Sequence, residues 1–196
     1  AYEIRPRDWS SDVCSSDLNT HSKTNGISGI GIPAGADAQV GDASTVVFTF
    51  EKALTPNVGV ELVLGVPPTV KSKATGSVAF LGDNVLSAKN VAPTVFVNYH
   101  FGSPSDALRP YVGLGLNYTK FVSIQSKLAP SVQMSESMGM AWVGGVDYAI
   151  SRQWGLYASA SSLDVRSNVV GVASTVLTTS IDFRPVVYSV GASYKF

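Results

Sequence analysis

The feature that most constrains this chain is a period-two alternation between apolar residues and small or polar ones. One segment shows it clearly, because Val112, Leu114, Leu116 and Tyr118 alternate with Gly113, Gly115, Asn117 and Thr119. Successive side chains of a β-strand point to opposite faces, so this pattern predicts strands with one apolar face. Seven such segments occur, at 46–51, 58–65, 95–101, 112–119, 139–148, 156–161 and 186–196. The chain is therefore predicted to be all-β.

The second face of these strands indicates which face is turned outward. It carries mostly Gly, Ser, Thr, Asn and Ala, whereas a solvated surface normally carries Lys and Glu. Only 14% of the residues are charged, against about 25% in soluble domains. Small polar residues in a narrow lumen, with an apolar outer face and aromatic residues near the strand ends, are typical of a transmembrane β-barrel. The aromatic residues near strand ends are Tyr99, Phe101, Tyr118, Tyr148, Tyr188, Tyr194 and Phe196.

The lengths of the connections support a membrane barrel. Short connections are expected near 53–57, 102–109 and 149–153, and long ones near 19–44, 66–90, 122–137 and 165–181. Short and long connections alternate strictly, as the periplasmic turns and extracellular loops of outer-membrane barrels do. The long connections 66–90 and 165–181 are poor in charge. They are interpreted either as apolar walls around a solute path or as flexible hairpin extensions.

Composition and motifs exclude several other functions. The 14 basic and 14 acidic residues balance, so the chain lacks the positive charge of a nucleic-acid-binding protein. The two histidines, His21 and His100, are expected at opposite ends of the barrel, where they cannot join one catalytic constellation. No His or Cys spacing fits a metal site. We therefore expect no enzymatic activity, no cofactor and no metal.

The first eighteen residues differ in character from the rest of the chain. Residues 1–18, AYEIRPRDWSSDVCSSDL, resemble the translation of a common sequencing-library index adapter. A segment of that kind is excluded from fold reasoning, and with it the single cysteine, Cys14. We therefore expect the native domain to cover residues 19–196, with its signal peptide and true N-terminus lost. The expected fold is an eight-stranded antiparallel transmembrane β-barrel with the native first strand missing and seven authentic strands.

Several stretches together resemble the outer membrane protein W family, including its alkane-uptake branch. They are PNVGVEL at 56–62, APT at 92–94, YHF at 99–101, RPYVGLGLNYT at 109–119, GVDY at 145–148 and GASYKF at 191–196. The resemblance implies an eight-stranded barrel in the bacterial outer membrane that passes small hydrophobic molecules through an apolar funnel. A leucine and a tryptophan narrow that funnel in the family. Their positions correspond here to Val63, which stays apolar, and Ser161, which does not.

Two groups of inward residues are candidates for the site. Val63, Tyr111, Tyr157, Ser161 and Leu163 are the candidate pore and ligand-lining residues. Glu61, Asn98, Asn117 and Asp147 are predicted to form a polar lumen network. That network is interpreted either as an ion path or as a plug of the inner half, and the narrow interior of an eight-stranded barrel favours the plug.

The expected function is passive uptake of small hydrophobic molecules through the barrel. The expected partners are outer-membrane lipid, a small hydrophobic solute and, through Phe196, the barrel-assembly machinery, but no nucleic acid. The alternative is a structural or adhesive barrel whose outer loops serve as a receptor for a host surface, phage or bacteriocin.

Overall fold

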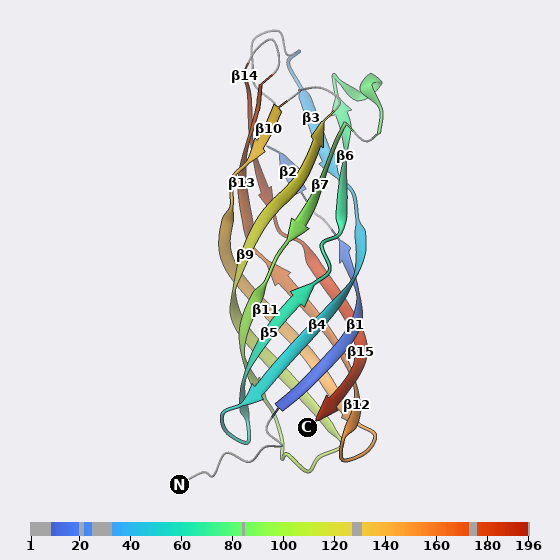
Figure 1. Ribbon diagram of the computed structural model, residues 1–196, viewed down its shortest axis with the longest axis vertical. Helices are drawn as coiled ribbons and strands as arrows, with labels where there is room; N and C mark the ends of the chain where they lie inside the picture. Colours follow the sequence, from blue (N-terminus) through green and yellow to red (C-terminus); the bar gives the residue numbers. More distant parts are fainter. Residues whose placement is uncertain are drawn as a thin grey trace.

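The computed structural model is a closed antiparallel β-barrel with strands that continue above it (Figure 1). It describes residues 9–19, 22–24, 33–83, 85–126, 131–172 and 176–195. The barrel strands are β1 (Trp9–Asn19), β4 (Ala43–Ala53), β5 (Val58–Gly65), β8 (Thr94–His100), β9 (Leu108–Ser126), β11 (Ser137–Ala149), β12 (Trp154–Leu163) and β15 (Val186–Lys195). Pairing of β9 with β11 closes the ring. The expectation of an all-β, eight-stranded barrel is confirmed.

The two faces of each strand lie as the alternation predicts. Leu116, Trp142 and Val190 on the outer face are 56%, 60% and 66% exposed, although all three are large and apolar. Their inward neighbours along the strands, such as Asn117 and Ala141, are fully buried. This inversion of the usual soluble pattern is expected only where lipid surrounds the protein.

The narrow lumen explains why glycines occupy inward positions. A Cβ atom added at Gly145 would lie 2.6 Å from Cζ of Tyr111, which fills the space across from it. Gly113 is equally confined, because its Cβ would meet Asn98 and Val143. These glycines therefore make room for larger side chains from neighbouring strands.

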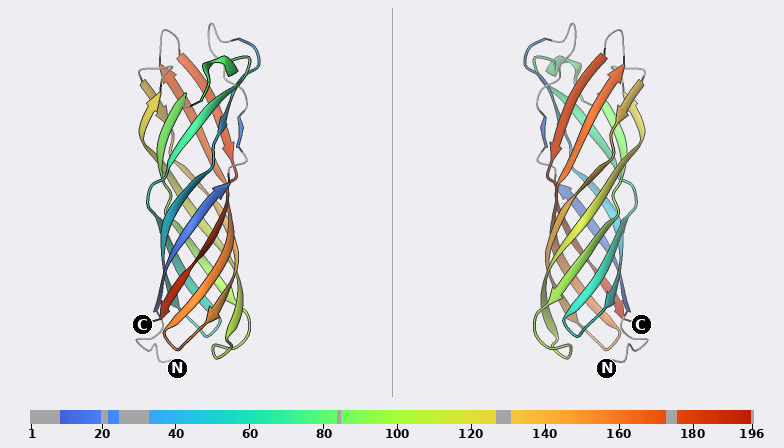
Figure 2. Two further views of the ribbon diagram at one scale, coloured as in Figure 1. Left: turned by 90° about the vertical axis from the view of Figure 1, so that its right-hand side faces the viewer. Right: turned by 90° about the vertical axis from the view of Figure 1, so that its left-hand side faces the viewer.

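The long connections contain paired strands in their described parts. Connections 66–90 and 165–181 hold antiparallel strand pairs, as their interpretation as hairpin extensions predicts. The long connections together hold β2 (Ser22–Thr24), β3 (Ala36–Val40), β6 (Thr69–Gly76), β7 (Leu86–Val91), β10 (Ser131–Met134), β13 (Val165–Val172) and β14 (Val176–Phe183), with a 3-10 turn, η1, at Ala79–Leu81. β9 is 19 residues long, so its outer half extends beyond β8 and pairs with β7. β10, β13, β14 and β2 form a second sheet. Figure 2 shows both groups rising from the same end of the barrel.

The outer strands reverse the polarity of the barrel strands. On β6, Val70 and Ala74 are buried while Lys71 and Lys73 are exposed. Ala74 packs with Ala36, Val78 and Val85 in a small apolar core. Charged side chains on the exposed face indicate contact with water, so this part of the sheet extends beyond the lipid-facing band.

Prolines mark the level at which barrel strands give way to outer strands. Pro68, Pro93 and Pro185 lack an N–H group and cannot donate to a strand ladder. Each still accepts a backbone hydrogen bond through its carbonyl, from Asn90, Tyr118 and Leu163 respectively, at 3.0–3.2 Å. The barrel wall therefore has a reduced set of ladder donors at this level.

The first strand of the barrel comes from the segment that resembles adapter sequence. β1 pairs with β15 on one side and with β4 on the other, so this strand position is occupied and both of its edges are hydrogen-bonded. Its inward face, with Cys14 and Ser16 buried, fits the lumen. Its outward face carries Ser11, Val13, Ser15 and Asp17, where other strands carry large apolar residues. The foreign origin of residues 1–18 and the boundary at residue 19 stay predictions.

Candidate functional site: a lumen cavity above a polar cluster

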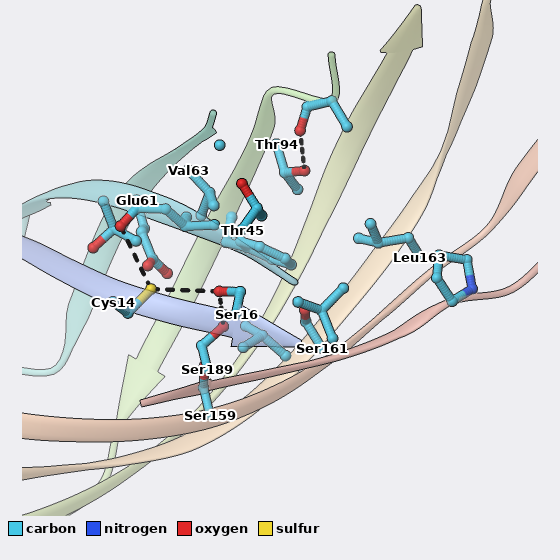
Figure 3. Close-up of a pocket in the computed structure, with 18 of the residues that line it drawn as sticks. Cys14, Ser16, Thr45, Glu61, Val63, Thr94, Ser159, Ser161, Leu163 and Ser189 are labelled. Carbon is cyan, nitrogen blue, oxygen red and sulfur yellow. Dashed lines mark hydrogen bonds between the residues drawn. The ribbon is translucent and has the colours of Figure 1, made fainter. Parts of the chain in front are cut away.

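The lumen contains a cavity of about 110 Å³ that is lined by residues from all eight barrel strands (Figure 3). Its apolar lining comes mainly from Val47, Val63, Phe96, Val143, Tyr157, Leu163 and Val165. Pro68, Ala92 and Pro185 add apolar surface at the level where the outer strands begin. The cavity therefore extends from the barrel interior to the base of the outer strands.

Hydroxyl groups occupy another part of the cavity wall, and several are already hydrogen-bonded. The Ser16 and Ser189 hydroxyls lie 2.8 Å apart, as Figure 3 shows. Thr49 donates to Asp12 at 3.0 Å, and Thr45 donates to the carbonyl of Val66. These hydroxyls therefore have partners within the wall, whereas the Tyr157 hydroxyl and Asn90 Oδ1, which also line the cavity, have none among the described residues.

Four of the five predicted lining residues meet at this cavity. Val63, Tyr157, Ser161 and Leu163 line it, and Val63 packs against both apolar clusters of the barrel core. Tyr111 is not among the lining residues. It is buried with Phe96, Ala141 and Val143, and its ring centroid lies 5.0 Å from that of His100. Alternation placed Tyr111 correctly on the inward face of β9, but the strand register puts it beside His100.

A cluster of charged and polar side chains occupies the inner half of the lumen. His100 Nε2 is 2.8 Å from Glu51 Oε1, and His100 Nδ1 is 3.2 Å from Asp147 Oδ2, close enough for an ion pair but not aligned for a hydrogen bond. Nearby on β8, the Asn98 amide donates to Glu61 Oε2 at 2.7 Å. Paired in this way, the buried charges avoid much of the cost of an isolated charge in a low-dielectric interior.

The four predicted network residues do not form a single network. Glu61 and Asn98 bond each other, and Asp147 contacts His100. Asn117 lies apart, where it donates to the Thr94 hydroxyl at 2.7 Å and accepts from the Thr119 hydroxyl at 2.6 Å.

Two residues of the polar cluster, His100 and Glu51, were not predicted as site residues. The alternation already indicated that both residues point inward. Glu51 lies two positions after the inward Thr49, and His100 lies two positions after the inward Asn98. His21 and Phe196 lie outside the described residues.

The polar cluster separates the main cavity from a smaller one at the inner mouth of the barrel. Glu61 lines the main cavity, whereas Glu51 and Asp147 line the smaller one, of about 30 Å³, together with Asp12 and Lys195. In the described part of the chain, no three His, Cys, Asp or Glu side chains are arranged to hold a metal ion. The arrangement thus offers an apolar binding space on one side and a polar constriction on the other.

An eight-stranded barrel with an apolar outer face, a lumen cavity and water-exposed outer strands defines an outer-membrane β-barrel protein. The chain belongs to the OmpW family, whose sequence profile matches residues 12–196. It is 30% identical over 158 residues to outer membrane protein W of Vibrio cholerae, covering 76% of this chain and 72% of that protein. Its location is therefore the bacterial outer membrane.

Two further comparisons agree with this assignment. Outer membrane protein AlkL of Ectopseudomonas oleovorans is 27% identical over 163 residues, which cover 82% of this chain and 70% of that protein. The crystal structure of OprG from Pseudomonas aeruginosa superposes with a TM-score of 0.87 over 96% of this chain and 95% of that one, at 24% identity. The latter likeness concerns the fold alone.

Proposed function

We propose that the barrel is a channel for the passive uptake of small hydrophobic molecules. The observation that carries this proposal is the cavity, whose lining is mainly apolar and which reaches the base of the outer strands at Pro68 and Pro185. The chain belongs to the OmpW family, and its sequence resembles the alkane-uptake branch of that family. Both observations support the channel proposal.

The driving force in this proposal is partition of the solute out of water. Each Å² of apolar surface that the cavity removes from water stabilises the bound solute by about 25 cal/mol, so neither nucleotide nor metal is required. The polar cluster around His100 disfavours a straight path through the lumen. We infer that the solute leaves sideways into lipid near the level of Pro93 and Pro185, which have no N–H group to donate to a neighbouring strand.

The test is uptake of n-octane by cells that express the barrel, compared with cells that carry an empty vector. Val63→Asp places a carboxylate in the apolar lining, and burying that charge opposes entry of the solute. We expect this variant to lose most of the uptake, while the near-isosteric Val63→Thr retains more of it. Asn168→Asp adds the same charge on the exposed part of β13 and is expected to leave uptake unchanged. Equal uptake by Val63→Asp and Asn168→Asp, with both folded, would contradict the proposal.

A receptor role for the outer strands is the second candidate. The observation in its favour is that the outer connections are paired strands, as in β13 with β14, and present an ordered surface. Replacing 165–183 by a short turn distinguishes the two roles. Loss of phage or bacteriocin binding with full octane uptake would favour the receptor.

A further inference from the structure

The Tyr157 hydroxyl is a buried polar group that the protein itself leaves without a partner. Tyr157 is 4% exposed, packs with Cys14 and Val47, and lines the main cavity. Among the described residues its hydroxyl has no hydrogen-bond partner. A buried hydroxyl without a partner destabilises the folded state, so such groups are uncommon and need an explanation.

The polar groups of Ser16 and Cys14, which line the same part of the cavity wall, have partners of their own. The Ser16 hydroxyl is bonded to Ser189, and the Cys14 thiol lies 3.5 Å from both the Ser16 hydroxyl and the Val47 carbonyl. Sulfur is in any case a weak acceptor. The Cys14 sulfur lies near the Tyr157 hydroxyl, but an oxygen atom of a cavity occupant would be a stronger acceptor.

Strand register places this donor at the polar end of the cavity. Tyr157 pairs with Asp147, and Glu61 pairs with Glu51; both of these partners contact His100. Tyr157 and Glu61 therefore lie next to the polar cluster. Leu163 lies farther along β12, about 20 Å along the strand axis, where Val165 and Pro185 add apolar lining beside Ser161 and Thr94.

We propose that the cavity takes an apolar chain that ends in one hydroxyl group, as in a medium-chain primary alcohol. The Tyr157 hydroxyl donates a hydrogen bond to the alcohol oxygen, and the alcohol proton faces the Glu61 carboxylate. The apolar chain extends towards Leu163. An alkane fills the same space but leaves the Tyr157 hydroxyl unpaired. This inference rests on the proposed function and adds a preference for oxygenated over plain hydrocarbons.

Cys14 supplies the assay, because it lines the cavity and is the single cysteine of the chain. A bound solute should shield the Cys14 thiol from N-ethylmaleimide. The measurement is the concentration of 1-octanol or n-octane that halves the alkylation rate of residues 1–196 in lipid vesicles. Comparing variants in the same vesicles cancels the different partition of the two solutes into lipid.

In Tyr157→Phe we expect the advantage of octanol over octane to fall about fivefold, as the loss of one hydrogen bond implies. Tyr111→Phe is the matched control, since Tyr111 is a similarly buried inward tyrosine that does not line the cavity. Its octanol-to-octane ratio should equal that of the unchanged chain. Tyr157→Phe should also unfold at the same or a higher urea concentration, because it removes an unpaired hydroxyl.

The outcomes separate this inference from the proposed function. If octane shields Cys14 but Tyr157→Phe leaves the octanol-to-octane ratio unchanged, the hydroxyl preference is wrong and the channel proposal stands. If neither solute shields Cys14, or if the thiol of the folded barrel does not react at all, the cavity is not accessible and the proposed function fails.

Discussion

Replacing His100 by leucine is expected to destabilise the barrel strongly, since it would leave two carboxylates facing each other in the lumen. His100 lies 2.8 Å from Glu51 and 3.2 Å from Asp147, and the three side chains are 10%, 18% and 33% exposed. Removing one member of a buried ion pair typically costs roughly 3–5 kcal/mol. The partial exposure of Asp147 leaves it some hydration, so we expect a loss of about 2–4 kcal/mol in the free energy of unfolding.

The assay is reversible urea unfolding of the barrel in lipid vesicles, with the free energy obtained by linear extrapolation. Leucine has a volume close to that of histidine, so the effect of the lost charge is separated from that of a cavity. A second substitution, Glu51→Gln, removes one of the two carboxylates left behind. The double variant His100→Leu/Glu51→Gln should therefore recover part of the lost stability.

Two results would refute this reasoning. A loss below about 1 kcal/mol for His100→Leu would place the pair in the range of exposed salt bridges. Absence of any recovery in the double variant would show that repulsion between Glu51 and Asp147 is not the cause of the loss.

Two further predictions concern the outer face and the outer strands. Ser15→Val should raise the free energy of unfolding in vesicles by about 1 kcal/mol, because Ser15 is exposed on the lipid-facing side of β1; an unchanged or lower value would contradict lipid contact there. The pKa of Glu136 lies below its ordinary value because its carboxylate accepts a hydrogen bond from the Lys120 ammonium. The ion pair between Glu136 and Lys120 is therefore fully present above the ordinary pKa of a glutamate, and it is lost as the pH falls through the lowered pKa of Glu136. In an NMR titration, Lys120→Met should move the Glu136 pKa upward, and no movement would argue against the contact.

The fold could be predicted from the sequence because the face of the sheet to which a side chain points is set within one strand. Whether Leu116 or Trp142 points outward depends only on its phase within one strand, and lipid imposes the same phase on every strand. The outer strands carried a signal too. On β6, Val70 and Ala74 alternate with lysines, which is the ordinary pattern of a strand in water. This pattern covers few residues, and it places apolar side chains inside and charged ones outside, the reverse of the barrel strands.

The site was less predictable, because it depends on register between strands. Tyr111 and Tyr157 are both inward, buried tyrosines, yet Tyr157 lines the cavity and Tyr111 packs against His100. No pattern within β9 or β12 alone gives the height of a residue in the lumen. For the same reason Asn117 could not be separated from Glu61 and Asn98 before the strand pairing was known.

The serines and the aspartate on the outer face of β1 show which contacts distinguish one amino-acid sequence from another at this position in the barrel. The ladder on either side of β1 joins backbone to backbone, so it accepts WSSDVCSSDLN as readily as any extended segment. The small inward side chains at positions 14 and 16 also suit the lumen. On the lipid-facing side, β1 presents Ser11, Ser15 and Asp17, the last bonded to the Ser44 hydroxyl, where neighbouring strands present valine and phenylalanine. Contact with the bilayer, more than backbone pairing, thus decides which sequences suit the first strand of this barrel.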